Sequence, residues 1–393
     1  TLPTWSGDPV LDGTLPIRAE SLAELARDRA ALGARWLTSV TRDDGSLFYL
    51  YAPASDEYEA EDYNEVRHAG TTYALFTAYG VTKDKSVLDA AEGGARYIDE
   101  NSRAVAGRPG RAFLYEGRTK LGGQALALVA LLERRRVLGD TVLDPLIQDL
   151  ADFMIAMELP EEPGRYQQHY LSESDAMLLE PAVHFYPGEA LLALTRLAQQ
   201  FPDGPYLEQA TRAARYLIYE KDGDIPAAGE VPRKDHWLTL ALCELYRLDT
   251  RTEYRDVAYL QAERMVANQY TAAQVPMRIG ATGDEGLVSY TSTATTGELL
   301  VSAWGLARFA GDAGREERFA QAAHRTLQFL MRIQMTEENT QLFPRPEAAI
   351  GGWGRNALEP WIRIDFVQHS MSALLGMWAM VTTGDLPVAV PQR

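Results

Sequence analysis

The chain has 393 residues, of which 46% are hydrophobic and 24% are charged, and its formal net charge at pH 7 is −17. A chain of this length and composition can bury a large core. The acidic balance argues against a nucleic-acid partner, because binding to phosphates requires clustered Lys and Arg. The single cysteine, Cys243, excludes an intramolecular disulfide. No apolar segment has transmembrane length, so we expect no membrane span.

The first residue is Thr1 rather than Met. This start is compatible with a removed signal peptide or with a shortened chain. The compartment therefore stays open between secreted or periplasmic, in the first case, and cytoplasmic. The oligomeric state is open as well.

Amphipathic segments with one charged face recur along the chain. Apolar residues at helical spacing, with Arg, Glu or Asp on the other side, predict an outer layer of helices over 20–40, 85–100, 143–158, 204–220, 253–270 and 314–334. After the first of these, Asp43-Asp44-Gly45-Ser46 predicts a turn and 47–51 a short aromatic strand.

A second set of helices opens on a recurring pattern, in which a polar or glycine-rich start precedes an apolar run with small residues. The six starts lie near Ala69, Gly122, Pro187, His236, Gly297 and Phe366. The runs that follow contain much Ala and Leu and few charges, as helices packed on both sides must. Outer and inner helices alternate strictly, so the sequence predicts an all-α fold.

We expect an (α/α)6 barrel of six outer and six inner helices, with short β-hairpins in the loops at one mouth. No Pro-rich or Ser-rich linker divides the chain, so we expect a single domain over 1–393, with 1–19 as an N-terminal arm and 383–393 as a C-terminal tail. Parallel inner helices would bring their N-termini, with unpaired N–H groups and positive dipole ends, to one mouth. That mouth is the expected site.

The alternation, the helix containing Trp36 and Leu37 ahead of Asp44-Gly45 and an aromatic strand, and the six inner starts resemble the six-hairpin glycosidase superfamily. These are the (α/α)6 toroids of carbohydrate-active enzymes, and the resemblance covers nearly the whole chain. It implies a carbohydrate substrate. The same toroid also carries sugar epimerases, polysaccharide lyases and lanthionine cyclases. The cyclases need a Cys and His zinc site, which Cys243 alone cannot supply.

Two inner starts near the beginning of the chain carry polar candidates. Asn64, Arg67 and His68 precede the first inner run and could bind hydroxyls or a carboxylate, or simply form an N-cap and a solvated loop. Glu116 is a candidate general acid, with Lys120 as its charge partner at the second start. A Glu and a Lys four residues apart also commonly form a plain ion pair.

The fourth and sixth starts carry the main carboxylate candidates. Asp235 is a candidate acid or base with His236 to orient it, or else a helix N-cap. Asp365 follows Arg363 and precedes His369. These residues could fix hydroxyls or an acidic substituent, or form a bridge at the barrel seam. In a closed ring, copies one and four face each other, which would place Arg67 and His68 across from Asp235.

Aromatic residues near the starts are expected to form the walls of the site, since their faces stack on sugar C–H surfaces. They are Tyr186, Tyr290, Trp353 and Trp361. Glu189 and Glu298 directly follow the glycine in their repeats, and we expect both to be structural residues in a first helical turn. His169, His184 and His324 lack metal-ligand spacing, so we expect neither a metal nor a cofactor.

These residues favour a glycoside hydrolase that acts on an oligo- or polysaccharide, possibly one containing uronic acid, through paired carboxylates. The catalytic candidates are Asp235, Asp365, Glu116 and His68. The alternatives are a uronyl C5-epimerase or polysaccharide lyase, suggested by the cationic residues at several starts, and a non-catalytic glycan-binding toroid.

Overall fold

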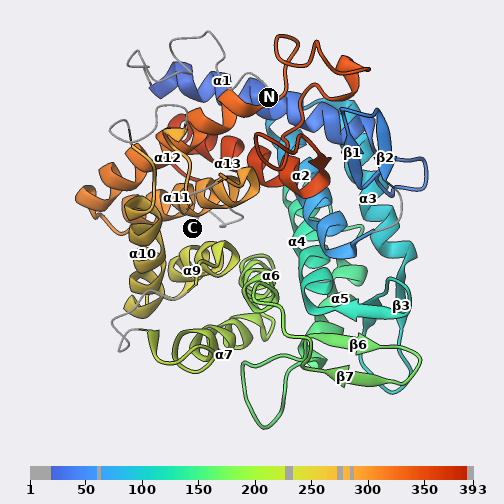
Figure 1. Cartoon of the computed structure of the whole chain (residues 1–393). Coiled ribbons are helices and arrows are strands. Elements are labelled where there is room, and N and C mark those ends of the chain that lie inside the picture. Colours follow the sequence, from blue (N-terminus) through green and yellow to red (C-terminus); the bar gives the residue numbers. More distant parts are fainter. Residues whose placement is uncertain (1–18, 60–62, 226–232, 272–277, 284–286, 387–393) are drawn as a thin grey trace. The chain divides into compact units, whose positions relative to one another are not determined.

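The computed structural model describes residues 19–59, 63–225, 233–271, 278–283 and 287–386 (Figure 1). In these residues the chain is dominated by twelve helices. They are α1 (Ala19–Ser39), α2 (Glu65–Thr82), α3 (Lys85–Glu100), α4 (Leu121–Leu138), α5 (Asp144–Ala156), α6 (Tyr186–Gln200), α7 (Tyr206–Tyr219), α9 (His236–Leu248), α10 (Thr252–Ala267), α11 (Tyr290–Phe309), α12 (Ala313–Ile333) and α13 (Ile364–Thr382). No helix in the described ranges is long and apolar enough to cross a membrane.

The described residues form two compact units. Unit 1 contains those up to Asn64, those in Thr77–Ala90 and those from Ala262 onward, and unit 2 contains Glu65–Phe76 and Ala91–Gln261. Helices α2, α3 and α10 contribute residues to both units. The single-domain organisation stays a prediction, and most of the expected arm and part of the expected tail lie outside the described residues.

Unit 1 is built on three main helix contacts, α1 with α13, α11 with α12, and α11 with α13. A small antiparallel sheet joins β1 (Leu50–Ala52) to β2 (Glu57–Glu59) on one side and to β8 (Ile362–Arg363) on the other. Leu50 stands opposite Arg363 in this sheet. Because β8 leads directly into α13, the predicted aromatic strand region fixes the start of the last inner helix.

Unit 2 packs α4 against α5 and α6, and α6 against α7 and α9. Two hairpin systems precede its inner helices. One is β3 (Ser102–Ala104) with β4 (Arg111–Phe113), and the other is β5 (Arg118–Lys120), β6 (His169–Leu171) and β7 (Ala176–Leu178) in the order β5-β6-β7. The expected short hairpins in the loops are therefore present.

Burial separates the inner from the outer helices as expected. Every residue of α4 from Leu121 to Arg134 is buried. Helix α7 instead buries one stripe, which includes Ala210, Ala213, Ala214 and Leu217 at helical spacing. The outer helices also lie close to their predicted ranges, and α3 matches its range at both ends.

Two inner helices begin earlier than expected. Helix α2 starts at Glu65, and α11 starts at Tyr290 behind an N-cap at Ser289, whose side chain accepts from the N–H of Ser292 at 3.3 Å. The composition of the threonine-rich stretch 291–296 is typical of a loop. In the structure it is helical, and the hydroxyls of Thr293 and Thr296 donate hydrogen bonds to backbone carbonyls one turn back, at 3.1 and 3.0 Å.

The early start of α11 corrects the expected role of Gly297. A methyl group on Gly297 would lie 3.1 Å from the Cβ of Ala373, so this glycine permits close packing of α11 on α13 rather than marking a helix start. Glu298 consequently lies in the helix interior, and the expectation that it occupies a first turn, equivalent to Glu189, is wrong.

Candidate functional site

In unit 2, the start of α4 meets the start of α2 through an ion pair. Lys120 ends β5 and stands opposite His169 of β6. Its ammonium group donates to Glu65 Oε2 at 2.9 Å, and Glu65 is only 1% exposed. The predicted binding lysine is therefore paired with a carboxylate from another helix rather than with Glu116.

Glu189 lies in the first turn of α6, is buried, and is close to the backbone of α4. A methyl group on Gly122 would lie 2.1 Å from Glu189 Oε2. Among the described residues, this oxygen has no hydrogen-bond partner. Burial, with the charge of Asp235 as a second cause, raises the pKa of Glu189 to about 8, although Arg67 acts in the opposite direction. The carboxyl therefore keeps its proton at neutral pH.

Asp235 is the N-cap of α9. Its Oδ1 accepts the backbone N–H of Leu238 at 3.0 Å, so the N-cap alternative describes its contact correctly. The side chain is 2% exposed. Burial raises the pKa of Asp235 to about 6, although the Leu238 N–H and the charge of Lys221 lower it. At pH 7 Asp235 is thus ionised while Glu189 is protonated.

Aromatic rings lie at the same two helix starts as these carboxyls. Tyr186, the first residue of α6, is buried and packs edge-on against the His169 ring at 6.1 Å. Burial and the charge of Glu189 raise the pKa of its phenol, which stays protonated. His236 opens α9, with its ring 5.8 Å from Phe185. Burial lowers the pKa of His169, so this imidazole is neutral at pH 7.

Two catalytic candidates of unit 2 lie in other surroundings. His68 is fully buried, with Nε2 3.1 Å from the carbonyl of Gly94 and its ring 4.4 Å from that of Tyr97. It therefore packs α2 on α3. Glu116 is exposed in the tight turn before β5, with a φ of 50°. Arg67, in contrast, is half-buried in α2 and acts electrostatically on Glu189 and Tyr186.

In unit 1, the start of α13 carries an internal ion pair. Two of the three guanidinium nitrogens of Arg363 donate to Asp365, Nε to Oδ1 and Nη2 to Oδ2, the latter at 2.9 Å. The Asp365 side chain is 9% exposed. This contact therefore corresponds to the alternative of an Arg–Asp bridge, in which the two predicted site residues form an ion pair with each other.

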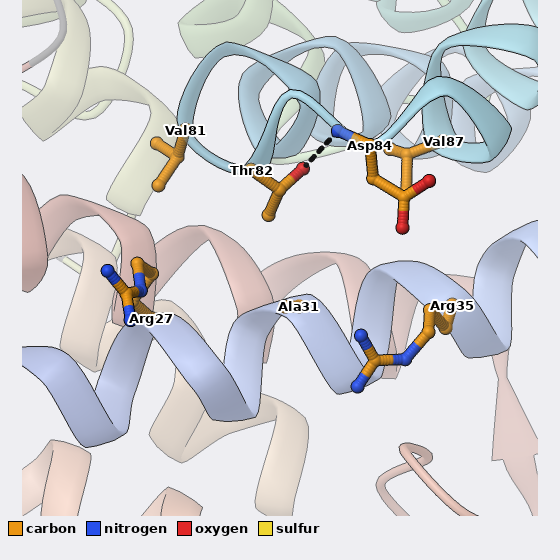
Figure 2. A pocket seen from close by; sticks show the side chains of 7 residues that line it. All are labelled: Arg27, Ala31, Arg35, Val81, Thr82, Asp84 and Val87. Carbon is orange, nitrogen blue, oxygen red and sulfur yellow. Dashed lines mark hydrogen bonds between the residues drawn. The ribbon is translucent and has the colours of Figure 1, made fainter.

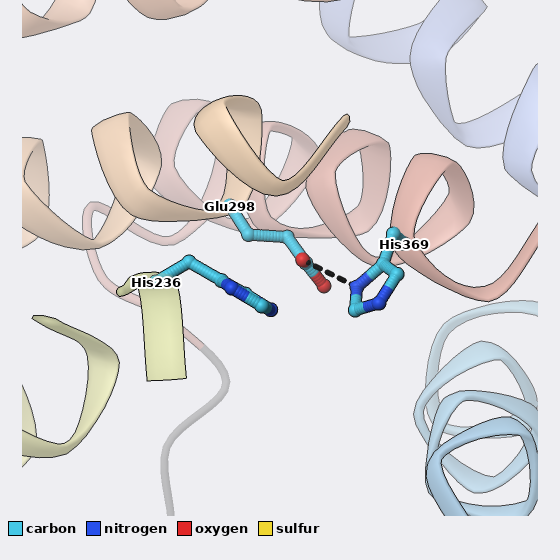
Figure 3. A group of neighbouring side chains, drawn as sticks. All are labelled: His236, Glu298 and His369. Carbon is cyan, nitrogen blue, oxygen red and sulfur yellow. Dashed lines mark hydrogen bonds and ion pairs between the residues drawn. The ribbon is translucent and has the colours of Figure 1, made fainter. Parts of the chain in front are cut away.

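A second pair in unit 1 joins α11 to α13. His369 Nδ1 lies 2.8 Å from Glu298 Oε2, and both side chains are buried (Figure 3). His236 is drawn in the same view but belongs to unit 2. A carboxylate bound at Nδ1 fixes the tautomer and orientation of an imidazole. The metal-free expectation stays a prediction.

The remaining candidates of unit 1 differ in exposure. Trp353 is fully buried, and its indole N–H donates to the carbonyl of Leu330 at 2.8 Å, so it belongs to the core rather than to a wall. Tyr290 is buried against Phe329, with ring centroids 5.8 Å apart. Trp361 is 43% exposed and is the one of the three available as a surface platform. Asn64 is half-buried directly before α2.

A cavity of about 280 Å³ lies in unit 1 between α1 and the turn from α2 to α3. Figure 2 shows Arg27 and Arg35 on α1 and Asp84 on the facing turn. Arg27 pairs with Asp28 at 3.0 Å, and Asp84 accepts the Ser86 N–H at 2.9 Å. No predicted site residue lines this cavity.

Two residues stand out in unit 2: Glu65, which the sequence interpretation did not single out, and Glu189, which it expected to be structural. Both are buried carboxyls with an oxygen that accepts no hydrogen bond from the described residues. The available signal was the glycine pair Gly122-Gly123, which leaves room beside the backbone at the start of a helix.

Comparison with known proteins supports the fold alone. No model of a known protein family matches this chain, and no curated protein sequence matches it. Among solved structures, the cellobiose 2-epimerase of Bacillus thermoamylovorans matches with a TM-score of 0.66 and 15% identity over 91% of this chain and 98% of its own.

Two hydrolases match nearly as well. An alpha-1,6-mannanase of Salegentibacter sp. HEL1_6 gives a TM-score of 0.60 and 14% identity over 93% of this chain and all 100% of its own. An unsaturated glucuronyl hydrolase specific for heparin gives 0.61 and 12% over 92% and 98%. The resemblance to six-hairpin enzymes is confirmed at the level of the fold: the chain is an all-α protein of the (α/α)6 class.

Proposed function

We propose that this protein is a carbohydrate-active enzyme that works by acid–base catalysis. The observation that carries the proposal is the pair of buried carboxyls in unit 2, Glu189 and Asp235, whose pKa values of about 8 and about 6 put them in different protonation states at pH 7. Titratable groups whose environments separate their pKa values are typical of acid and base partners. The fold, shared with sugar epimerases and glycosidases, supports a sugar substrate.

The first form of the proposal is a glycoside hydrolase. Protonated Glu189 donates its proton to the glycosidic oxygen as the bond from that oxygen to the anomeric carbon breaks. Ionised Asp235 removes a proton from the water that adds to the same carbon, so one water is consumed and two hydroxyls are made. The predicted acid Asp365 is a weaker candidate for the proton donor, because its carboxylate is already in an ion pair with Arg363.

Two cations of unit 2 are proposed to bind the substrate. Arg67 acts on the Glu189 carboxyl, and the Lys120 side chain remains 21% exposed beside Glu65. An ammonium group has three N–H donors, so Lys120 retains capacity for sugar hydroxyls after pairing with Glu65. The phenol of Tyr186 is proposed to line the same helix starts.

The second candidate function is a sugar epimerase, including a uronyl C5-epimerase, or a lyase. The observation that favours it is the buried Glu298–His369 pair, at 2.8 Å. With Nδ1 facing the carboxylate, Nε2 of His369 is the nitrogen that would take a carbon-bound proton from the sugar and return it. A lyase would instead expel the leaving oxygen after the same proton removal.

Incubation with matched neutral and uronic oligosaccharides in heavy water separates these functions. Hydrolysis gives a new reducing end without deuterium at carbon, epimerisation gives carbon-bound deuterium without cleavage, and a lyase gives an unsaturated end. Glu189→Gln should abolish hydrolysis, whereas His369→Gln should abolish exchange. Binding of these sugars without any conversion would reject both enzymatic forms and favour a glycan-binding protein.

A further inference from the structure

Gly122 leaves space that the Glu189 side chain occupies. It is the second residue of α4, and a methyl group on it would lie 2.1 Å from Glu189 Oε2 and 2.4 Å from Tyr186 Cδ1. Real Cβ atoms essentially never come within 3.0 Å of another heavy atom. Any other residue at this position must therefore displace the carboxyl or the ring.

The backbone does not itself require glycine here. Gly122 lies in regular helix, outside the left-handed region that favours glycine. Glycine is also among the least favourable residues inside a helix. The space it leaves is thus the feature that distinguishes it from alanine.

A similar arrangement recurs at two other glycines, one at the start of α6 and one beside Gly122 in α4. A methyl group on Gly188 of α6 would lie 3.0 Å from Asp235 Oδ1, and one on Gly123 would lie 3.0 Å from Glu65 Cγ. At Gly188, however, the methyl would also meet the Leu238 backbone nitrogen at 2.7 Å. At Gly122 the closest obstacles are all side-chain atoms, and the nearest is the Glu189 carboxyl at 2.1 Å, which makes Gly122 the position for testing the effect on Glu189.

We infer that Gly122 is a positioning residue, which sets the place of the Glu189 carboxyl by allowing it to rest on the backbone of α4. With this contact the carboxyl lies in a buried space beside Tyr186, where Oε2 meets no donor in the described chain. Without it the carboxyl must move toward other surroundings. The effect on turnover rests on the proposed acid role of Glu189, whereas the effect on its position does not.

Gly122→Ala tests the inference, with Gly314→Ala as its matched control. Gly314 is likewise the second residue of its helix, α12, and its methyl group would meet nothing closer than Asp312 Oδ1 at 3.8 Å. Both changes add the same methyl group to a first helical turn. The measurements are the pKa of Glu189, by carbon-13 NMR of the labelled carboxyl against Glu189→Gln, and the pH profile of kcat/KM.

We expect Gly122→Ala to lower the pKa of Glu189 by at least one pH unit and to move the basic limb of the pH profile by the same amount, while Gly314→Ala changes neither. Adding Glu189→Asp to Gly122→Ala shortens the acid and should restore part of the raised pKa. An unchanged pKa in Gly122→Ala would overturn the inference. So would failure to fold of both Gly122→Ala and its double variant, since the shorter acid removes the contact at 2.1 Å and the Tyr186 ring at 2.4 Å would then be the side chain that Gly122 accommodates. A shifted pKa without any change in activity would support the positioning role and reject the acid role of Glu189.

Discussion

The carboxyls on the inner helices of the two units differ in how their hydrogen-bonding capacity is satisfied. In unit 1, Asp365 is held by Arg363, with one contact at 2.9 Å, and Glu298 faces His369 at 2.8 Å. In unit 2, Glu189 has an oxygen without a partner in the described chain, and burial raises its pKa to about 8. Unit 1 therefore holds these acids in fixed pairs, while in unit 2 burial raises the pKa of the Glu189 carboxyl.

The sequence pattern favours Asp365 over Glu189 as a catalytic candidate, and the contacts in the structure favour the opposite order. Asp365 is conspicuous in the sequence because it follows Arg363 and precedes Phe366 at a helix start. In the structure, however, Arg363 forms an ion pair with the Asp365 carboxylate. Glu189 sits in a first helical turn, where a structural glutamate is expected, yet it is 4% exposed and lacks a cation in direct contact on Oε2. Pairing, which only three-dimensional contacts reveal, decides between the two.

Amide substitutions test the difference between Glu189 and Asp365 most directly. Glu189→Gln removes a transferable proton but keeps the shape and the neutral charge of the protonated acid. We expect turnover of the cleaved sugar to fall by about 10²–10⁴-fold with folding and sugar binding retained, as for loss of a general acid. Asp365→Asn should cost less than tenfold in the chemical step, measured by single-turnover kinetics. A larger loss in Asp365→Asn than in Glu189→Gln would reverse our assignment.

The pH dependence of folding stability should also reveal the raised pKa of Glu189. Folded Glu189 keeps its proton up to about pH 8, whereas the unfolded chain releases it near 4.5, so between these values the folded state binds more protons. Stability must therefore fall as the pH rises through this window, by on the order of 4 kcal/mol from this group. Denaturant unfolding of Glu189→Gln should show a flatter decline than the wild type. Equal slopes would mean that Glu189 ionises normally.

Much of the fold could be predicted from the sequence because helical periodicity is a local property. The outer helices carry a charged face and an apolar stripe, and α3 matches its predicted range at both ends. The failure at α11 has a physical cause, since Thr293 and Thr296 bond back to helix carbonyls in a segment whose composition reads as a loop. Gly297 then serves packing on Ala373 rather than a helix start.

The candidate site could be predicted only in part. Asp235 and Lys120 could be predicted because polar residues at helix starts are conspicuous, but the partner of Lys120 is remote in sequence. Glu65 pairs with Lys120 across 55 residues, and no spacing rule connects them. The raised pKa of Glu189 depends on burial by its surroundings, which a pattern in one helix does not reveal.

Removal of Arg363 tests how much its ion pair with Asp365 stabilises unit 1. Arg363→Gln leaves Asp365, whose side chain is 9% exposed, without its cation. We expect the free energy of unfolding to fall by about 1–3 kcal/mol, the usual cost of removing a charged hydrogen-bond partner. The double variant with Asp365→Asn should recover part of that loss. No change in stability after Arg363→Gln would show that this pair is not what holds the start of α13.

The smallest effect is expected at the exposed aromatic of unit 1. Trp361 is 43% exposed, so Trp361→Ala should leave folding intact and weaken sugar binding by about tenfold or less, as for loss of one stacking contact. Trp353→Ala is the contrasting change, since this buried ring should cost about 3–5 kcal/mol in stability. Calorimetry for binding and thermal unfolding for stability read the two effects separately.

The central claim is that Glu189 carries a proton at neutral pH beside an ionised Asp235. The most direct test is a carbon-13 NMR titration of the glutamate side-chain carboxyls in the intact protein, with the Glu189 signal assigned by its loss in Glu189→Gln. The account predicts a midpoint near pH 8, as the burial of this carboxyl requires. A midpoint near 4.5, the ordinary value for glutamate, would contradict it.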